Sequence, residues 1–308
     1  MKETGLLREG DLQNDPQRTK GLIVEFALHL KKKGYANETV IQQPKLLRIL
    51  SDRGANLYNQ ESVKETIANQ SWCPGRKENA VDAYTNFLLL HGMSWDPPKY
   101  QRIQKIPFIP LEKEINDLIA GVGRKTAAFL QLLKETGMRA GEAWNLEWTD
   151  LDMESNSVRI TPEKGSNPRV LRVSDKCLAM LNCLRKDGKR VFGDYPRNGF
   201  ARSFHRQRKS LSVKLQNPRI QQISFHTFRH WKATMHYHKV RDLLDVMKLL
   251  GHKNIKNTMI YMHTLPFHED DEFISKVART VDEACQLVEL GFEHVCDMDD
   301  ARIFRKRK

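Results

Sequence analysis

The stretch from Ser224 to His238 carries four histidines, one arginine and several aromatic residues. If it is a helix, which advances about 100° per residue, then His226, Arg229 and His230 share one face. The opposite face shows the i, i+3, i+7 pattern of a buried stripe, made of Phe228, Trp231 and Met235. We therefore predict a helix that packs through this stripe and presents two imidazoles and a guanidinium elsewhere.

Two kinds of ligand come into question for this histidine-rich face. His226 and His230 stand four residues apart, as in helices that hold zinc with two histidines and carry a glutamate after the first. Here Thr227 takes the place of that glutamate, and Arg229, which cannot lose its proton, would repel a metal cation at this face. Guanidinium and imidazole donors suit an anion better, because the planar fork of arginine matches phosphate oxygens. We predict an anion site without a metal, and a surface helix with incidental histidines is the plain alternative.

Three other stretches carry residues of the same chemical kinds. In "TGMRAGEAWNLEW", Arg139 follows a predicted helix end and Glu142 stands three residues on, where it can brace the arginine. In "TPEKGSNPR", Lys164 lies at the tip of a predicted β-hairpin, from which a long side chain can reach a ligand. In "LLGHKNIKNTMIYMH", a glycine stops a helix, His252 follows in the turn, and Tyr261 comes nine residues later.

The composition indicates a two-domain protein that meets a polyanion. A chain of 308 residues suggests two domains. Its 51 Lys and Arg residues against 38 Asp and Glu residues give a net charge of +13, for which nucleic acid is the usual partner. The five cysteines form no CxxC pair, so neither a disulfide framework nor a zinc ribbon is expected. With a polar N-terminus and no apolar run near ~20 residues, we expect a cytoplasmic protein and no membrane partner.

Hydrophobic periodicity divides the chain into parts. Helical patterns near residues 20–33, 37–51, 59–68 and 76–91 predict a small helical bundle. The stretch "WDPPKYQRIQKIPFIP" is too rich in proline to be helical, and its basic residues can follow a charged partner. The expected parts are a flexible N-terminus (1–19), a helical domain (20–96), a basic linker (97–110) and a second domain (111–308) with a C-terminal tail from about residue 269.

The second domain mixes helices with a small amount of strand. We predict helices at 111–120, 125–135, 241–250 and 281–290, a β-hairpin with strands around 158–160 and 170–173, and a small hairpin turning at Asp299–Asp300. The fold class is therefore mainly α with a small antiparallel β-hairpin or sheet. Residues 185–209 hold nine Lys and Arg residues interleaved with Phe and Tyr. From this run and the linker, the candidate DNA-backbone contacts are Lys99, Arg102, Lys105, Arg202, Arg206 and Arg208.

In this order and with these neighbours, the residues resemble the tyrosine recombinase (integrase) family. The shared pattern is Arg139-x-x-Glu142, Lys164 on a hairpin, His226-x-x-Arg229-His230, Leu250-Gly251-His252 and Tyr261. The resemblance covers 107–264, and it covers 20–95 more loosely as the helical core-binding domain that such proteins place before the catalytic domain. The closing residues are similar to archaeal members. The implied partners are double-stranded DNA and further copies of the chain, in a tetramer on paired sites.

The resemblance implies roles for the arginines and their neighbours. Arg139 and Arg229 would clamp the non-bridging phosphate oxygens, on which charge builds during attack. His252 would add a hydrogen bond to the phosphate. Glu142 and His230 would orient neighbouring groups without taking part in the chemistry.

The resemblance also implies a covalent intermediate. Tyr261 would be the nucleophile, whose hydroxyl loses its proton as it attacks. His226 would accept that proton or contact the phosphate, and Lys164 would protonate the departing 5′-oxygen. The product would be a 3′-phosphotyrosyl link, and strand exchange through a Holliday junction would need no ATP, metal or other cofactor.

Two other functions use the same residues. A type IB topoisomerase shares this chemistry and relaxes supercoils as a monomer, but the 47 residues after Tyr261 favour a recombinase, in which they can contact a neighbouring protomer. A DNA-binding protein whose catalysis has decayed is the third possibility. The presence of all six candidate catalytic residues argues against it.

Overall fold

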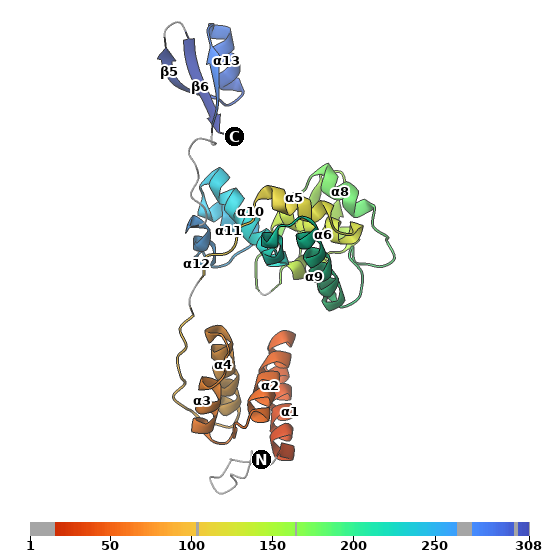
Figure 1. The fold of residues 1–308 in the computed structure, drawn as a ribbon, viewed down its shortest axis with the longest axis vertical. Coiled ribbons are helices and arrows are strands. Elements are labelled where there is room, and N and C mark those ends of the chain that lie inside the picture. Colours follow the sequence, from red (N-terminus) through yellow and green to blue (C-terminus); the bar gives the residue numbers. More distant parts are fainter. Residues whose placement is uncertain (1–15, 103–104, 164, 264–272, 299–300, 308) are drawn as a thin grey trace. The chain divides into compact units, whose positions relative to one another are not determined.

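The computed structural model describes residues 16–102, 105–163, 165–263, 273–298 and 301–307. The chain divides into two compact units, Met1–Lys105 and Ile106–Lys308. Mainly helical structure with small antiparallel sheets confirms the fold class that the sequence predicts (Figure 1). Within the described ranges, no helix has the length and apolar character needed to cross a membrane.

The first unit is a bundle of α1 (Pro16–Lys32), α2 (Asn37–Asp52), α3 (Gln60–Ala68) and α4 (Pro74–Leu90). Its core is formed by apolar side chains from all four helices, among them Phe26, Leu47, Val63 and Phe87. The predicted helices are confirmed to within a few residues, and α3 begins where the Asn59 side chain accepts hydrogen bonds from the N–H groups of Glu61 and Ser62. One boundary was wrong, because residues 16–19, expected to be flexible, form the first turn of α1.

The second unit begins with α5 (Glu112–Ala120), α6 (Arg124–Thr136) and α7 (Ala140–Trp144). Most side chains of α6 are buried, so this helix forms the centre of the unit, with α5, α8 and α10 packed around it (Figure 1). The remaining elements, up to residue 263, are η2 (Trp148–Asp150), β1 (Leu151–Asp152), β2 (Ser157–Ile160), β3 (Arg169–Arg172), α8 (Asp175–Asn182), α9 (Arg197–Lys214), η3 (Pro218–Gln222), α10 (Phe225–Val240), α11 (Leu243–Leu250), α12 (Lys256–Met259) and η4 (Ile260–His263). The strands form one antiparallel sheet in the order β1-β2-β3, with Val158 opposite Leu171, and β2 and β3 are the predicted hairpin.

The basic run at 185–209 enters helix α9, which the sequence analysis did not predict. Phe200 and Phe204 are buried and stack with other aromatic rings of the core. The phenylalanines of this run therefore pack inside the protein, whereas Tyr195 is exposed. Arg202 and Arg206 are exposed on the other side of the same helix.

Residues 273–298 and 301–307 form a small folded βαββ unit in place of the expected tail. It consists of β4 (Phe273–Ala278), α13 (Val281–Glu289), β5 (Glu293–Met298) and β6 (Ala301–Arg307), with the sheet order β4-β6-β5. Its own small core contains Ala278, Ala284, Leu287, Phe292 and Phe304. The predicted helix and the antiparallel pairing of the last two strands are confirmed, strand β4 was missed, and the predicted turn at 299–300 lies outside the described residues.

Candidate active site

The first catalytic candidate, Arg139, lies at the corner between α6 and α7. Helix α6 ends at Gly137, whose φ of +62° is a left-handed conformation that glycine adopts without strain. Two residues later Arg139 caps α7, and its backbone N–H donates to Glu142 Oε2 at 2.9 Å. The Arg139 side chain also donates to Glu142, from Nη1 to Oε1 at 3.1 Å. Glu142 thus braces Arg139 as predicted from their spacing.

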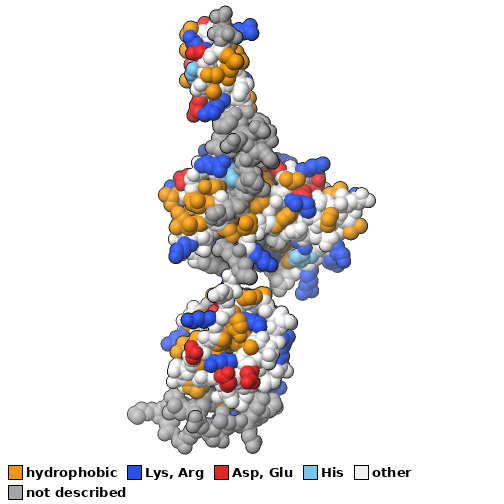
Figure 2. All heavy atoms as spheres, turned by 60° about the vertical axis from the view of Figure 1, so that its left-hand side comes forward, with side chains coloured by type: hydrophobic (Ala, Val, Ile, Leu, Met, Phe, Trp, Pro, Cys, Tyr) orange, Lys and Arg blue, Asp and Glu red, His pale blue; other side chains and the backbone are white. Residues whose placement is uncertain are grey.

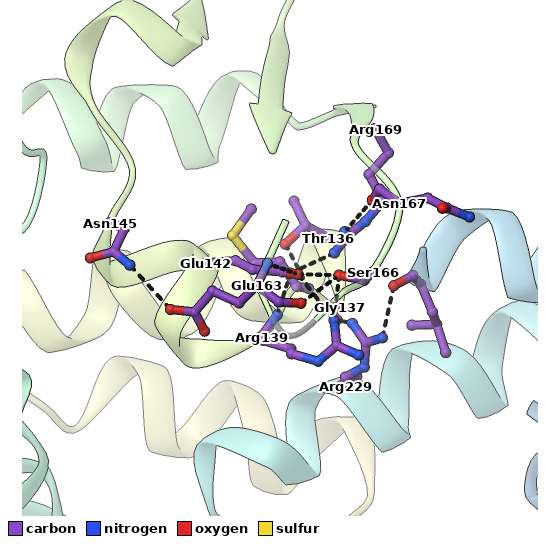
Figure 3. Close-up of polar contacts among 12 residues, drawn as sticks. Thr136, Gly137, Arg139, Glu142, Asn145, Glu163, Ser166, Asn167, Arg169 and Arg229 are labelled. Atoms are coloured by element: carbon purple, nitrogen blue, oxygen red, sulfur yellow. Dashed lines mark hydrogen bonds and ion pairs between the residues drawn. The ribbon is translucent and has the colours of Figure 1, made fainter. Parts of the chain in front are cut away.

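Glu142 joins Arg139 to the β2–β3 hairpin (Figure 3). Its carboxylate is fully buried and accepts hydrogen bonds from Ser166 Oγ at 3.0 Å and from Arg169 Nη2 at 2.7 Å. Burial raises the pKa of this carboxyl, but the hydrogen bonds from Arg169, the Arg139 backbone and Ser166 outweigh burial and bring the pKa down to about 2. The carboxylate is therefore charged at neutral pH. Lys164, the predicted general acid, belongs to the same hairpin but lies outside the described residues.

Arg229 connects two helix ends. It lies on α10, only 2% exposed, and donates from Nη1 to the Gly137 carbonyl at 2.9 Å and from Nη2 to the Leu250 carbonyl at 2.7 Å. Both carbonyls end helices, where the partial charge is negative and suits a cation. Burial, and next to it repulsion from Arg139, lower the pKa of Arg229 to about 10, so it stays charged at neutral pH.

Tyr261 is buried beside an imidazole. It belongs to η4, is 2% exposed, and packs with Ala233, Val246 and Leu250. Its Oη lies 3.2 Å from His230 Nδ1. Burial raises the pKa of the Tyr261 hydroxyl, while Arg229 and Arg139 act in the opposite direction.

His226 and His230, which share a face of α10, lie against each other in the structure. His230 contacts the Tyr261 hydroxyl, whereas His226 stacks edge-on against His230 with ring centroids 4.6 Å apart. Burial, followed by the neighbouring His226 and Arg229, lowers the pKa of His230 to about 4, so its ring is neutral at pH 7 and able to accept a proton. The resemblance gives His226 the role of proton acceptor or phosphate contact, and that role stays a prediction.

His252 follows the helix stop at Gly251, which has φ of +68°. The ring is 8% exposed, and its Nδ1 lies 2.9 Å from Thr258 Oγ1, which orients it. Burial, with further contributions from Arg229 and Arg139, lowers the pKa of His252 to about 4. At neutral pH this histidine is an uncharged hydrogen-bonding group.

The candidate DNA contacts fall into two groups. Lys99, Lys105, Arg202 and Arg206 are exposed, and their role in DNA binding stays a prediction. Arg102 pairs with Glu78 and Asn79 of its own unit, and Arg208 is half-buried and donates to the Ile223 carbonyl, so intramolecular bonds occupy both. On the face shown in Figure 2, Lys and Arg side chains are spread between apolar and uncharged groups. Within the described part of the chain, no cluster of three or more His, Cys, Asp or Glu residues could hold a metal ion.

Two residues of the site were not found from the sequence. Ser166 donates to Glu142 and also accepts from Arg139 Nη1 at 2.6 Å. Arg169 forms the ion pair with Glu142, and its side chain is 6% exposed. The only signal was their position in "TPEKGSNPR", within five residues of Lys164.

The site thus combines a buried tyrosine next to an imidazole, the buried Arg229, and Arg139, which Glu142 braces. The model of the phage integrase family matches residues 111–268, and the chain belongs to this family, that of the tyrosine recombinases. It is 30% identical over 217 residues to a tyrosine recombinase of Thermosipho africanus, covering 66% of this chain and 73% of that protein. It is 28% identical over 190 residues to tyrosine recombinase XerA of Saccharolobus solfataricus, covering 59% of this chain and 61% of that protein.

Solved structures agree on the fold. The Tn1549 transposon integrase in complex with transposon right-end DNA superposes with a TM-score of 0.62 at 14% identity, covering 89% of this chain and 99% of that one. The XerH site-specific recombinase bound to its difH substrate gives a TM-score of 0.56 at 15% identity, covering 82% and 95%. At these identities the likeness concerns the fold alone.

Proposed function

We propose that this chain is a site-specific DNA recombinase that cuts and rejoins duplex DNA through a covalent 3′-phosphotyrosyl link to Tyr261. The observation that carries this proposal is the 3.2 Å contact between the Tyr261 hydroxyl and a neutral His230, next to the buried cation Arg229. These groups are a nucleophile, a proton acceptor and an electrophilic clamp. Their combination is what a transesterification at a phosphodiester requires.

The chemistry follows from the charges of the site. When Tyr261 Oη attacks phosphorus, negative charge builds on the non-bridging oxygens, which Arg139 and Arg229 neutralise. The phenolic proton passes to His230 Nδ1, and the bond from phosphorus to the 5′-oxygen breaks. Lys164 is the proposed donor of the proton that this oxygen takes up. One phosphodiester bond is replaced by another, so the reverse reaction rejoins the strand without ATP.

The burial of Tyr261 means that the proposed attack on DNA requires a conformational change. Because Tyr261 as a whole is only 2% exposed, its hydroxyl cannot reach a phosphate of duplex DNA where it lies. The segment that carries it, η4, must therefore shift when DNA binds. We further propose that a tetramer on two paired DNA sites exchanges strands through a Holliday junction.

The covalent link is the test. The protein is incubated with supercoiled plasmid, quenched with detergent and digested, and mass spectrometry searches for a nucleotide on the peptide that contains Tyr261. The Tyr261→Phe variant should give no adduct while DNA affinity stays within about threefold, because one buried hydroxyl contributes little to a phosphate interface. Tyr35→Phe, at an exposed tyrosine of the first unit, is the matched control.

The products separate the alternatives. Recombined molecules identify a recombinase, and relaxed circles with no exchange identify a topoisomerase-like activity. Tight DNA binding without any adduct, on plasmid and on a library of nicked oligonucleotides, would show a decayed DNA-binding protein and refute the proposal.

A further inference from the structure

Arg169, the first residue of β3, is charged and buried beside the candidate catalytic residues. Its side chain is 6% exposed, and Nη2 donates to Glu142 Oε2 at 2.7 Å. On its other side the guanidinium lies against Gly251, where an added Cβ would come within 2.9 Å of Nη1. Enclosed in this way, the guanidinium points into the protein and is not presented to DNA.

Three chain segments that carry catalytic candidates meet at this guanidinium (Figure 3). Helix α7 and the corner before it contact the Arg169 guanidinium through Glu142, which also accepts a hydrogen bond from Arg139. The turn after α11 joins the hairpin through the Asn167 N–H, which donates to the Gly251 carbonyl at 2.9 Å, next to the Leu250 carbonyl that holds Arg229. The hairpin itself contributes Arg169.

The hairpin tip has a further anchor on the same corner. Glu163, directly before Lys164, accepts a hydrogen bond from Asn145 Nδ2 at 3.1 Å. Its carboxylate lies so close to Gly141 that any Cβ there would collide with it. The tip is therefore tied to α7 on both sides of Lys164.

Arg169 also affects the charge balance around Glu142 and therefore Arg139. The two carboxylate oxygens divide their partners, since Oε1 accepts from the Arg139 guanidinium and Oε2 from Arg169. If Arg169 were absent, Arg139 would be the main cation left to neutralise a buried carboxylate. Its guanidinium would then be drawn toward Glu142, and the positive potential that it offers to a phosphate would fall.

We propose that Arg169 is a positioning residue for strand cleavage: it neutralises Glu142 so that Arg139 keeps its place and its charge for the scissile phosphate. This inference rests on the proposed function, because cleavage is the step that it supports. Arg169 itself touches neither the phosphate nor the tyrosine. Its effect is therefore on the rate of cleavage and not on DNA affinity.

The first experiment does not depend on activity. The guanidinium ¹⁵N resonances of Arg139, assigned with Arg139→Lys, are compared in the native chain, Arg169→Met and the control Arg159→Met. Arg159 is the matched control because it lies on the neighbouring strand β2 in an ion pair with Asp150 and is 67% exposed. Arg169→Met should move the Arg139 resonances and Arg159→Met should not. Unchanged resonances in Arg169→Met would overturn the inference even if the native chain cleaves DNA.

The second experiment measures cleavage on a DNA fragment on which the native chain forms the Tyr261 adduct. Arg169→Met should slow single-turnover cleavage by about 10- to 100-fold, as expected for a residue that orients a catalytic group, with DNA affinity changed by less than about threefold. Arg169→Lys should recover part of the rate because it restores the charge. Arg159→Met should leave cleavage and affinity unchanged.

A methylphosphonate at the scissile position separates positioning from a general loss of structure. Replacing one non-bridging oxygen by methyl removes the negative charge that Arg139 has to neutralise. The defect of Arg169→Met should therefore shrink at least several-fold on this DNA. An equal defect on both substrates would show that Arg169 only stabilises the fold. A native chain without adduct would refute the proposed function, while the Arg139 resonances would still decide the inference.

Discussion

Replacing Glu142 by glutamine measures how strongly the stability of the second unit depends on one buried carboxylate. The side chain is fully buried and receives hydrogen bonds from Arg139, Ser166 and Arg169. Glutamine has the same shape but no charge, and its NH2 group replaces one acceptor oxygen and faces N–H or O–H donors. The variant should therefore lose the pH-dependent part of the stability that comes from ionisation, and in addition a part that does not depend on pH, from the lost hydrogen bonds.

The magnitude and its pH dependence follow from the pKa of Glu142. Burial raises this pKa, yet the hydrogen bonds, with that from Arg169 foremost, lower it from 4.5 to about 2. A carboxyl with this change on folding contributes about 3 kcal/mol to the free energy of unfolding at pH 7. Since the unfolded chain holds the proton more tightly, the contribution is complete above about pH 5 and is lost as the pH falls toward 2, with about 1 kcal/mol left at pH 3.

Urea unfolding followed by fluorine NMR of 5-fluorotryptophan-labelled protein checks this prediction. Trp144, two residues after Glu142 on α7, reports on the right unit even if the first unit unfolds separately. Glu112→Gln is the control, because Glu112 is 61% exposed in its ion pair with Lys134, and an exposed pair of this kind is worth under about 1 kcal/mol. A difference between native protein and Glu142→Gln that is the same at pH 7 and pH 3 would refute the reasoning, and so would a difference at pH 7 no larger than that of the control.

Three further outcomes are expected. Arg229→Lys should lower the single-turnover cleavage rate at saturating DNA by about 100-fold or more, because one ammonium cannot span the two carbonyls and also serve the phosphate; a rate within a few-fold of native would exclude Arg229 as a clamp. Lys164→Ala should slow cleavage of ordinary DNA far more than cleavage of DNA with a bridging 5′-thiolate, which leaves without a proton, and equal defects in the two rates would count against the general acid. The logarithm of the DNA affinity should fall linearly with the logarithm of salt concentration, and the slope should be about one unit shallower in Arg206→Gln. In the control Arg208→Gln the slope should be unchanged, because the Arg208 guanidinium already donates to a backbone carbonyl. Equal slopes in the two variants would show that Arg206 does not contact DNA.

Local features of the chain were predictable from residue types alone. Most of the helices, α9 excepted, could be found because apolar residues repeat with the period of the α-helix, and their ends because particular residues stop or start them. Gly137 ends α6 and Gly251 ends α11 in left-handed conformations, and Asn59 caps α3. The order of the catalytic motifs, which identifies the family, is likewise a property of the linear sequence.

Tertiary contacts decided which neighbours each functional group meets. His226 and His230 are equivalent on a helical wheel, but only the packing of η4 against α10 brings Tyr261 to His230. Arg169 and Glu142 are 27 residues apart, so no local pattern could pair them. The shifted pKa values, near 2 for Glu142 and near 4 for His230, also depend on the tertiary structure, because they arise from burial and from groups brought together by folding. Hydrophobic periodicity in the sequence shows which face of a helix or strand is apolar. The distances between side chains on different elements are set only when those apolar faces pack together.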